Sequence, residues 1–290
     1  MSVTPVPSTL AALLIVAVLE PFLRLHGGST FTPGRQEPAT AEWVARQVEN
    51  RDTGRDGRFT LKMRLFDRQQ RVRDRELTFL TMRRAASGQG SGASRTAAGS
   101  GDRVLIRFTY PNDIRGTAFL VWEHPDAEDE RFLYLPALGR VRRIAGAEAQ
   151  DNFVGSDFTY EDISGREFDD YTYAMVEQNG FWTAPDSQRW AAYRIESRAR
   201  DAQARFPRVI STVRKDNFVV VHAEIYNRRN EHQKTYDVRR LDKVQGIWTL
   251  SDVVMANLAD RTRTELTIAK AEYNVGLNES DFSRRELERK

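Results

Sequence analysis

The sequence contains no cysteine, and this absence removes several kinds of site at once. A disulfide framework, a zinc–thiolate site, a thiol nucleophile and a lipobox lipid anchor all require that residue. Histidine is scarce too: the 290 residues include four, and His26, His124, His222 and His232 show no metal-ligand spacing. His222 lies on an expected strand, where a solvated or hydrogen-bonded imidazole is a better interpretation than a ligand. The sequence therefore predicts neither a metal nor a cofactor.

Motifs of common enzymes are missing as well. The chain has no G-x-S-x-G elbow, H-E-x-x-H pair, P-loop or dinucleotide-binding fingerprint. Gly155-Ser156-Asp157 is not a nucleophile motif, and no histidine is near it in sequence. Paired carboxylates such as Asp169 and Asp170 occur in any acidic loop. We therefore expect a protein that is not an enzyme, with a hydrolase as the less favoured alternative that ester and glycoside substrates would reveal.

A strong charge of one sign is also missing. The 44 Lys and Arg residues nearly balance 41 Asp and Glu residues, which leaves a net charge of +3. The basic residues alternate with acidic neighbours and form no stripe, so no nucleic-acid partner is expected. The hydrophobic fraction of 40% and charged fraction of 29% are typical of a globular protein. The length allows one large β domain or two ordinary domains.

The N-terminus holds the longest apolar run, the ten residues 10–19, which Glu20 and Pro21 end. This length is typical of the core of a signal peptide and is too short for an ordinary membrane span. The flanks are unusual, because residues 1–9 contain no Lys or Arg and no clean A-x-A cleavage site follows the apolar run. Residues 1–26 are predicted to be an atypical signal peptide; an uncleaved anchor or a mis-assigned start is the alternative. Residues 27–39, rich in Gly, Pro and Thr, would be a flexible linker.

A single domain is expected from residue 40 to residue 290. Residues 40–49 predict a short helix that Thr40 caps and on which Trp43, Val44 and Val48 share a face. Residues 85–101 consist almost entirely of small residues and predict a mobile loop. Eleven segments are expected to be strands; residues 59–65, 104–110 and 219–225 alternate with a period of two, and short turns join consecutive strands, which predicts an antiparallel meander. These segments are residues 59–65, 76–83, 104–110, 117–124, 130–135, 190–197, 209–214, 219–225, 233–245, 247–257 and 261–274.

Two segments have a composition that their strands and turns do not explain. Residues 132–144 read FLYLPALGRVRRI, and residues 153–163 read FVGSDFTYEDI. Together with the ending at residues 276–287, they resemble the LolA-like outer-membrane lipoprotein-sorting family. The resemblance spans residues 40–287; the loop at 85–101 and the irregular N-terminus depart from it. It implies a mainly β (α+β) fold, in which a large curved antiparallel sheet forms a half-open LolA/LolB-like β-barrel. A few helices cover its concave face, and one of them would come from residues 145–170.

The same resemblance implies a carrier in the periplasm of a Gram-negative-type envelope, tethered by its N-terminus if that segment is not cleaved. It would shelter the acyl chain of a lipid or a lipidated protein, contact membranes transiently and work beside an inner-membrane exporter of the RND or MMPL type. Large apolar residues of the expected strands are the candidates for the cavity lining, although each of them is equally an ordinary core residue. They are Phe108, Phe119, Val121, Trp122, Phe132, Tyr134, Tyr193, Ile195, Val221 and Ile225.

The second segment supplies the loop typical of the family. Its candidate residues are Gly155, Ser156, Asp157, Phe158, Tyr160, Glu161 and Asp162. Gly155 would allow a positive φ, and Ser156 or Asp157 would cap a short helix. The acidic residues would fix the loop or pair with Arg140, Arg142 and Arg143, since their spacing does not match an EF-hand calcium loop. Those arginines either contact a lipid head group or a partner, or lie in a solvated turn.

Two further hypotheses compete with the carrier. The strand count fits an outer-membrane-associated β-barrel superficially, although no aromatic girdles are visible and the charged C-terminus lacks an apolar final strand. An accessory protein of an RND-type exporter would bind its partner through a free sheet edge. Residues 117–122 (TAFLVW) are apolar on both faces. They therefore face either a lumen and a partner, or the interior of the protein on both sides.

Overall fold

The computed structural model describes residues 38–83, 102–124, 127–165 and 168–289. The expected signal peptide, nearly all of the expected linker and the loop at residues 85–101 lie outside these ranges. Within them, the helices are too short or too polar to cross a membrane.

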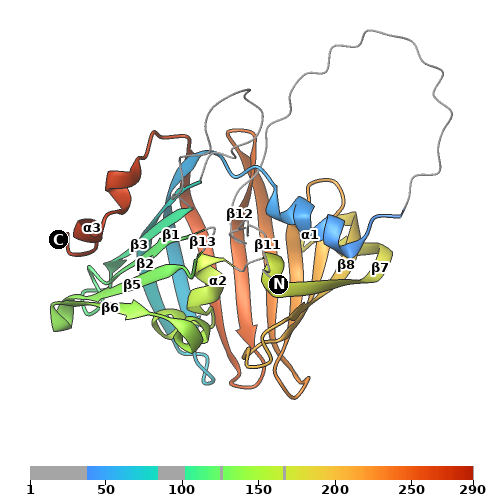
Figure 1. Cartoon of the computed structure of the whole chain (residues 1–290), viewed down its shortest axis with the longest axis horizontal. Coiled ribbons are helices and arrows are strands. Elements are labelled where there is room, and N and C mark those ends of the chain that lie inside the picture. Colours follow the sequence, from blue (N-terminus) through green and yellow to red (C-terminus); the bar gives the residue numbers. More distant parts are fainter. Residues whose placement is uncertain (1–37, 84–101, 125–126, 166–167, 290) are drawn as a thin grey trace, which may run out of the picture.

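The described chain forms one antiparallel sheet of thirteen strands, which confirms the predicted mainly β fold (Figure 1). Its spatial order is β6-β5-β4-β3-β2-β1-β13-β12-β11-β10-β9-β8-β7. The strands are β1 (Asp56–Phe66), β2 (Val72–Met82), β3 (Arg103–Tyr110), β4 (Ala118–Trp122), β5 (Glu130–Leu135), β6 (Arg140–Ile144), β7 (Tyr171–Thr183), β8 (Arg189–Ala199), β9 (Arg208–Arg214), β10 (Val220–Tyr226), β11 (His232–Val244), β12 (Ile247–Asn257) and β13 (Thr262–Tyr273).

The strand order places two meanders side by side. Strands β1 to β6 run outward on one side, β7 to β13 return inward on the other, and β1 pairs with β13 in the middle. The edges β6 and β7 do not pair with each other, so the sheet does not close into a barrel, as the outer-membrane alternative would require. Residues 145–170 join these two edges. The described part of this connection covers the concave face, where Phe153 and Tyr160 pack against Phe119 of the sheet.

Short helices complete the fold. The α-helices are α1 (Ala41–Glu49), α2 (Tyr160–Ser164) and α3 (Arg284–Leu287), and the 3-10 turns are η1 (Pro136–Leu138), η2 (Gly146–Gln150), η3 (Phe153–Gly155), η4 (Phe168–Asp170) and η5 (Glu279–Phe282). Figure 1 shows α1 over the β7–β8 side of the sheet and α2 near its middle. The expected second covering helix is therefore one short helix within a chain of 3-10 turns.

Helix α1 begins as predicted. The Thr40 Oγ1 accepts a hydrogen bond from the Trp43 N–H at 3.1 Å, which satisfies one of the free donors at the start of the helix. Its apolar face packs on the sheet, where Val44 and Val48 join a cluster with Ile195 and Val213. Trp43 does not share that face fully: it is 44% exposed and packs edge-on against Phe218.

Strand β4 is buried on both faces. Phe119 and Val121 belong to the core of the concave face, whereas Leu120 packs on the opposite face against Phe282 and Leu287 of the C-terminal segment. The Trp122 Nε1 donates to the Phe282 carbonyl at 2.7 Å and holds that segment in place. The apolar residues 117–122 are therefore explained by a strand that the protein covers on both sides.

Two edge strands were not predicted. Strand β6 lies where a basic turn is expected, because three of its five residues are arginines and two of these are adjacent; charged residues of this kind protect a free edge. Strand β7 has alternating residues only at its start, and its pairing with β8 shifts register on both sides of Glu177. These shifts interrupt the period of two and hide the strand.

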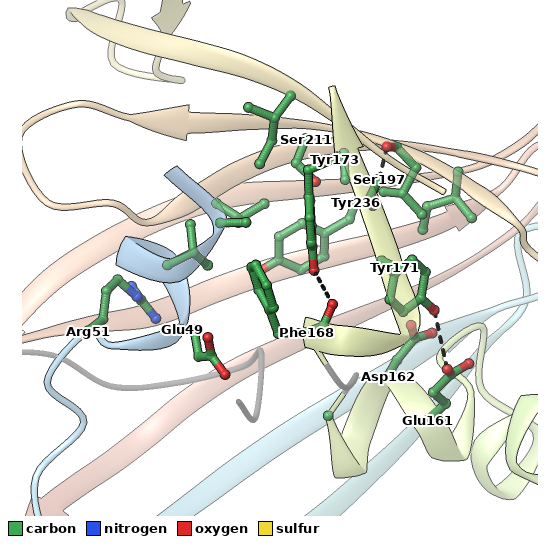
Figure 2. Close-up of a pocket in the computed structure, with 18 of the residues that line it drawn as sticks. Glu49, Arg51, Glu161, Asp162, Phe168, Tyr171, Tyr173, Ser197, Ser211 and Tyr236 are labelled. Atoms are coloured by element: carbon green, nitrogen blue, oxygen red, sulfur yellow. Dashed lines mark hydrogen bonds between the residues drawn. The ribbon is translucent and has the colours of Figure 1, made fainter. Parts of the chain in front are cut away.

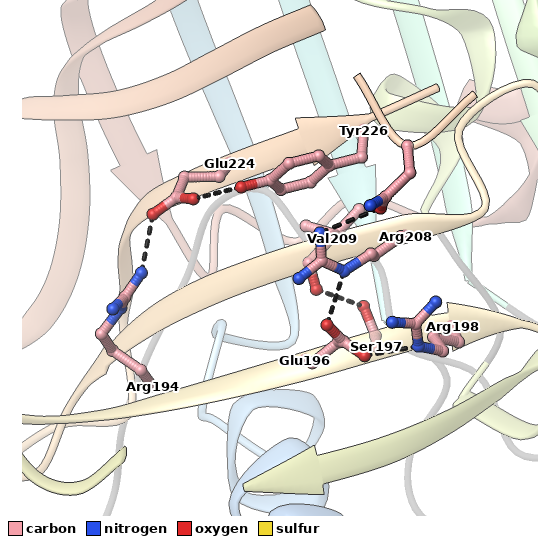
Figure 3. A network of polar contacts seen from close by, with 9 residues as sticks. Arg194, Glu196, Ser197, Arg198, Arg208, Val209, Glu224 and Tyr226 are labelled. Atoms are coloured by element: carbon pink, nitrogen blue, oxygen red, sulfur yellow. Dashed lines mark hydrogen bonds and ion pairs between the residues drawn. The ribbon is translucent and has the colours of Figure 1, made fainter. Parts of the chain in front are cut away.

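The convex face of β8 to β10 carries a charged network (Figure 3). The Arg208 Nε donates to Glu196 at 2.6 Å, and the Arg194 Nη2 donates to Glu224 at 2.7 Å. Tyr226 adds a hydrogen bond from its hydroxyl to Glu224 at 2.6 Å. Because successive side chains of a strand point to opposite faces, the same strands present apolar residues to the concave side.

Candidate functional site

A cavity of about 130 Å³ lies on the concave face, between α1, strands β8 to β12 and the end of the connection from α2 to η4 (Figure 2). The sheet supplies its apolar floor, α1 covers it, and aromatic side chains from η4 and β7 form one wall. The apolar and aromatic lining residues are Ala45, Val48, Phe168, Tyr171, Tyr173, Ile195, Val209, Val220, Ala223, Ile225, Tyr236, Leu250 and Met255.

Small side chains on neighbouring strands leave this space open. Ser197, Ser211 and Ala223 all line the cavity, and Ser211 lies opposite Ala223 in the β9–β10 pairing. The Ser197 hydroxyl is turned to the backbone, where it donates to the Val209 carbonyl at 3.5 Å. A serine or an alanine fills much less of a concave surface than the phenylalanines at equivalent depth in the other half of the sheet.

That other half is filled. Phe108 and Phe119 of the sheet meet Phe153 and Tyr160 of the connection, with ring centroids 5.1–5.9 Å apart. Edge-to-face and offset arrangements at such distances are favourable and pack densely. Two aromatic residues of the family-like loop therefore act as a plug, and they close the β1–β6 half of the concave face.

Asp157 ties the same loop to the sheet. Its carboxylate accepts hydrogen bonds from the hydroxyls of Thr262 and Thr264, and the Asp157 N–H donates back to Thr264 at 2.9 Å. The Lys234 Nζ donates to the Asp157 carbonyl at 2.5 Å. The acidic residue thus fixes the loop, one of the two roles expected for it. No local pattern indicates its three partners, because they lie 77, 105 and 107 residues away along the chain.

The short helix α2 has a different cap from the one predicted. Thr159, not Ser156 or Asp157, is its N-cap: the Thr159 Oγ1 accepts from the Asp162 N–H, and Asp162 accepts from the Thr159 N–H, both at 2.9 Å. Gly155 adopts the expected positive φ, at 72°. Ser156 and Phe158 are buried beside it, and Glu161 accepts a hydrogen bond from Tyr171 at 3.4 Å.

The ten lining candidates fall into four places. Ile195 and Ile225 line the cavity, and Tyr193 packs beneath α1. Phe108, Phe119, Val121 and Val221 belong to the filled core of the concave face. Trp122, Phe132 and Tyr134 lie on the opposite face, under the C-terminal segment. Strands β4 and β5 are apolar on both sides, so alternation could not show which face these three residues take.

The arginines of β6 lie away from the cavity. Arg140, Arg142 and Arg143 are exposed along the free edge of the sheet, and Arg142 pairs with Glu148 at 3.5 Å. This exposed position is compatible with both expectations for the arginines. They can contact a lipid head group or a partner, or they can be solvated.

Two charged lining residues escaped the sequence analysis, Glu49 and Arg51. Burial lowers the pKa of Arg51 to about 10 and raises the pKa of Glu49, which Arg46 lowers in part. Burial also raises the pKa of Tyr236 well above its usual range. In sequence, Glu49 and Arg51 look like ordinary charges at a helix end. The described residues contain no group of three His, Asp or Glu side chains that would hold a metal ion.

Comparison with known proteins agrees with this architecture. A family model described as "Uncharacterized protein"-like matches residues 100–289. A solved structure described as an outer membrane lipoprotein-sorting protein domain from Vibrio parahaemolyticus is 26% identical, with a TM-score of 0.73 over 86% of this chain and 98% of that one. The chain belongs to the LolA-like outer-membrane lipoprotein-sorting family.

Two further structures extend the LolA-like assignment. A DUF1329 family protein from Desulfovibrio piger is 25% identical, with a TM-score of 0.71 over 84% of this chain and 95% of that one. A LolA superfamily protein from Nitrosomonas europaea is 16% identical, with a TM-score of 0.61 over 86% and 99% of the two chains, and shares the fold. Among curated proteins, none matches. The LolA-like fold thus accounts for the open antiparallel sheet.

Proposed function

We propose that this protein is a periplasmic carrier that shelters the acyl chain of a lipid or a lipoprotein and passes it between membranes. The observation that carries the proposal is the apolar cavity between α1 and strands β8 to β12, in a chain of the LolA-like family. A buried methylene is worth about 0.8 kcal/mol, so a sixteen-carbon chain needs about 12 kcal/mol of shelter to cross water. An apolar cavity provides shelter of that kind.

The volume of the cavity describes a closed state. An engineered apolar cavity of about 150 Å³ holds a molecule the size of benzene. The 130 Å³ found here accommodates only part of a long acyl chain. Loading therefore requires the cavity to widen. Each strand of the floor is hydrogen-bonded to a neighbour on both sides. The elements that move aside are therefore α1, α2 and η4, and cargo shifts the equilibrium towards the open state.

The experiment that tests the carrier is native mass spectrometry of the protein purified from its own cell envelope, followed by organic extraction. We expect an acyl-bearing molecule to co-purify in a defined stoichiometry. Protein that is empty after purification and takes up no acyl chain when mixed with lipid would overturn the proposal. Cell fractionation tests the compartment: the proposal requires the protein in the periplasmic fraction, either free or retained on a membrane by its N-terminus.

We also propose that the cavity is not catalytic. Its described lining contains no histidine, and the Ser197 hydroxyl donates to a backbone carbonyl. An activated serine needs an adjacent base. Hydrolysis of ester or glycoside substrates that disappears when Ser197 or Ser211 is changed to alanine would contradict this.

The exporter of the RND or MMPL type is proposed on the family resemblance alone. Chemical cross-linking in intact cells, followed by identification of the captured membrane protein, tests it. If the protein is cross-linked only to lipid or to a soluble protein, the exporter is not its partner. The proposed lipid binding would be unaffected by that result.

A further inference from the structure

Four polar atoms on the wall of the cavity have no hydrogen-bond partner among the described residues. The Arg51 Nε and Nη1 and both carboxylate oxygens of Glu49 are shielded from solvent and make no hydrogen bond with the described residues. Both side chains line the cavity (Figure 2). Nearly all buried polar groups of folded proteins are hydrogen-bonded, so four unpaired atoms in one place require an explanation.

The backbone that carries these side chains is held firmly. The Arg83 guanidinium binds the end of α1: its Nη1 donates to the Arg51 carbonyl at 2.6 Å, and its Nη2 donates to the Glu49 carbonyl at 2.9 Å. Glu49 lies 3.7 Å from the Arg46 Nη1, which is close enough for attraction and too far for a good hydrogen bond. In the closed state this backbone is therefore held in place, while the side-chain Arg51 Nε and Nη1 and the Glu49 carboxylate oxygens remain available for hydrogen bonds.

The charges of the cavity favour an anion next to Arg51. Arg51 is the one cation among the described lining residues, and its pKa of about 10 keeps it charged at neutral pH. The other lining acids already have partners, since Asp162 caps α2 and Glu161 accepts from Tyr171. The Arg46 guanidinium, whose Nη1 lies 3.7 Å from the Glu49 carboxylate, offsets part of the negative charge of Glu49.

We propose that Glu49 and Arg51 form a head-group site at the polar end of the cavity. The N–H groups of Arg51 donate to an anionic oxygen of a phosphate or carboxylate, and Glu49 accepts a hydrogen bond from an N–H or O–H of the same head group. The proposal deepens the carrier function and rests on it, because the acyl chain of the same molecule occupies the apolar part. It selects lipids whose head carries both an anion and a donor, such as an ethanolamine phosphate.

The test compares amphiphiles that share one acyl chain and differ in the head. Isothermal titration calorimetry of the full-length protein, below the micelle concentration, measures lysophosphatidylethanolamine, lysophosphatidylcholine, the lysophosphatidate, the fatty acid and the monoacylglycerol. We expect the ethanolamine lipid to bind about tenfold more tightly than the monoacylglycerol, which lacks the anion, and several-fold more tightly than the choline lipid, which lacks the N–H donors. The relative affinities of the lysophosphatidate and the fatty acid distinguish a phosphate from a carboxylate. Free O-phosphoethanolamine, a head without a chain, should bind at least about a hundredfold more weakly.

Two variants assign the effect. Arg51→Met should remove the preference for the anionic heads, Glu49→Met should remove the preference for ethanolamine over choline, and Arg68→Met, an exposed control in the β1–β2 turn, should change neither. The comparison of head groups on the unmodified protein tests the head-group site even if a variant does not fold.

Each remaining outcome has a distinct meaning. Equal affinity for charged and uncharged heads would overturn the head-group site and leave the carrier. Failure of every amphiphile to bind would overturn both, and tight binding of O-phosphoethanolamine alone would replace the lipid by a soluble anion.

Discussion

Asp157 shows how much of this fold depends on single polar residues. It is buried, and it connects the loop at residues 153–159 to β13 through two threonine hydroxyls and to β11 through Lys234. Hydrogen bonds to a charged group contribute more than neutral ones, and their loss would leave Thr262 and Thr264 without an acceptor. The role of Asp157 in the family-like loop is thus to hold the aromatic plug against the sheet.

The first prediction concerns this residue. Asp157→Ala should lower the free energy of unfolding by about 2–3 kcal/mol, measured by urea denaturation. Asp157→Asn, which keeps one acceptor oxygen, should cost less. The matched control is Asp151→Ala in the same connection, where the side chain is exposed and a change below about 0.5 kcal/mol is expected. Equal effects at both positions would contradict the anchoring role.

The second prediction concerns the charged network of Figure 3. Burial opposes ionisation of Glu196, but hydrogen bonds from Arg208 and Arg198 outweigh it and lower the pKa of Glu196 below the usual 4.5. The folded pKa is therefore below the unfolded one. The resulting stabilisation is fully present above pH 4.5 and is lost as the pH falls through the folded pKa.

Urea unfolding of the unmodified protein and of Glu196→Gln at several pH values measures this effect. We expect the variant to be less stable by about 0.5–1 kcal/mol at pH 7 and the difference to shrink as the pH falls below 4.5. A difference that grows on acidification would show that the sign is wrong.

At the scale of elements, α1 is the part of the site that can move. It is a single helix of nine residues, fixed by the Thr40 cap at its start and by Arg83 at its end. A helix this short is marginal without its tertiary contacts. The floor of the cavity consists of paired strands and has no comparable freedom. Cargo exchange should therefore follow the local stability of α1.

The third prediction uses the cap. Thr40→Ala should weaken the start of α1 by about 1 kcal/mol, lower the hydrogen-exchange protection of its amides and speed the exchange of a bound acyl probe. Ser283→Ala is the control, because Ser283 is the N-cap of α3 without a side-chain hydrogen bond. If the protection of α1 falls and probe exchange does not change, the α2–η4 segment is the moving element.

At the scale of the whole molecule, the concave face has a filled half and a hollow half. Phenylalanines of β3 and β4 meet the aromatic plug on one side, whereas Ser197, Ser211 and Ala223 leave space on the other. The connection between the two sheet edges crosses the same face, so the plug and the hollow are consequences of one topology.

The fourth prediction tests the hollow half. Ala223→Phe should fill the cavity and reduce co-purified acyl ligand at least about tenfold in native mass spectrometry, because a phenylalanine ring occupies the space of several methylenes. Ala191→Phe introduces the same side chain at an exposed position of β8 and should leave the ligand unchanged. Circular dichroism confirms that both variants fold. Undiminished ligand in Ala223→Phe would place the cargo elsewhere.

Local sequence patterns predicted much of the fold. Alternation and short apolar segments predicted eleven of the strands, Thr40 predicted the start of α1, and Gly155 predicted a positive φ. Strands β6 and β7 were not predicted. The charged residues of β6 and the register shifts of β7 interrupt the alternation of apolar and polar residues that marks a strand. The cap of α2 was misplaced by two or three residues, since Ser156, Asp157 and Thr159 all suit that position.

What the sequence determined by itself is therefore the architecture, the family and the apolar character of the interior, because alternation, caps and motif residues are local properties of the chain. Which apolar residues line a hollow was decided only by the tertiary structure. Phe132 and Ile195 look alike in sequence, yet one lies beneath the C-terminal segment and the other faces the cavity. The same is true of Glu49 and Arg51, because only the packing of the elements around them leaves their side chains without hydrogen-bond partners among the described residues. A cavity is the space that side chains from distant strands fail to fill, and no local pattern records it.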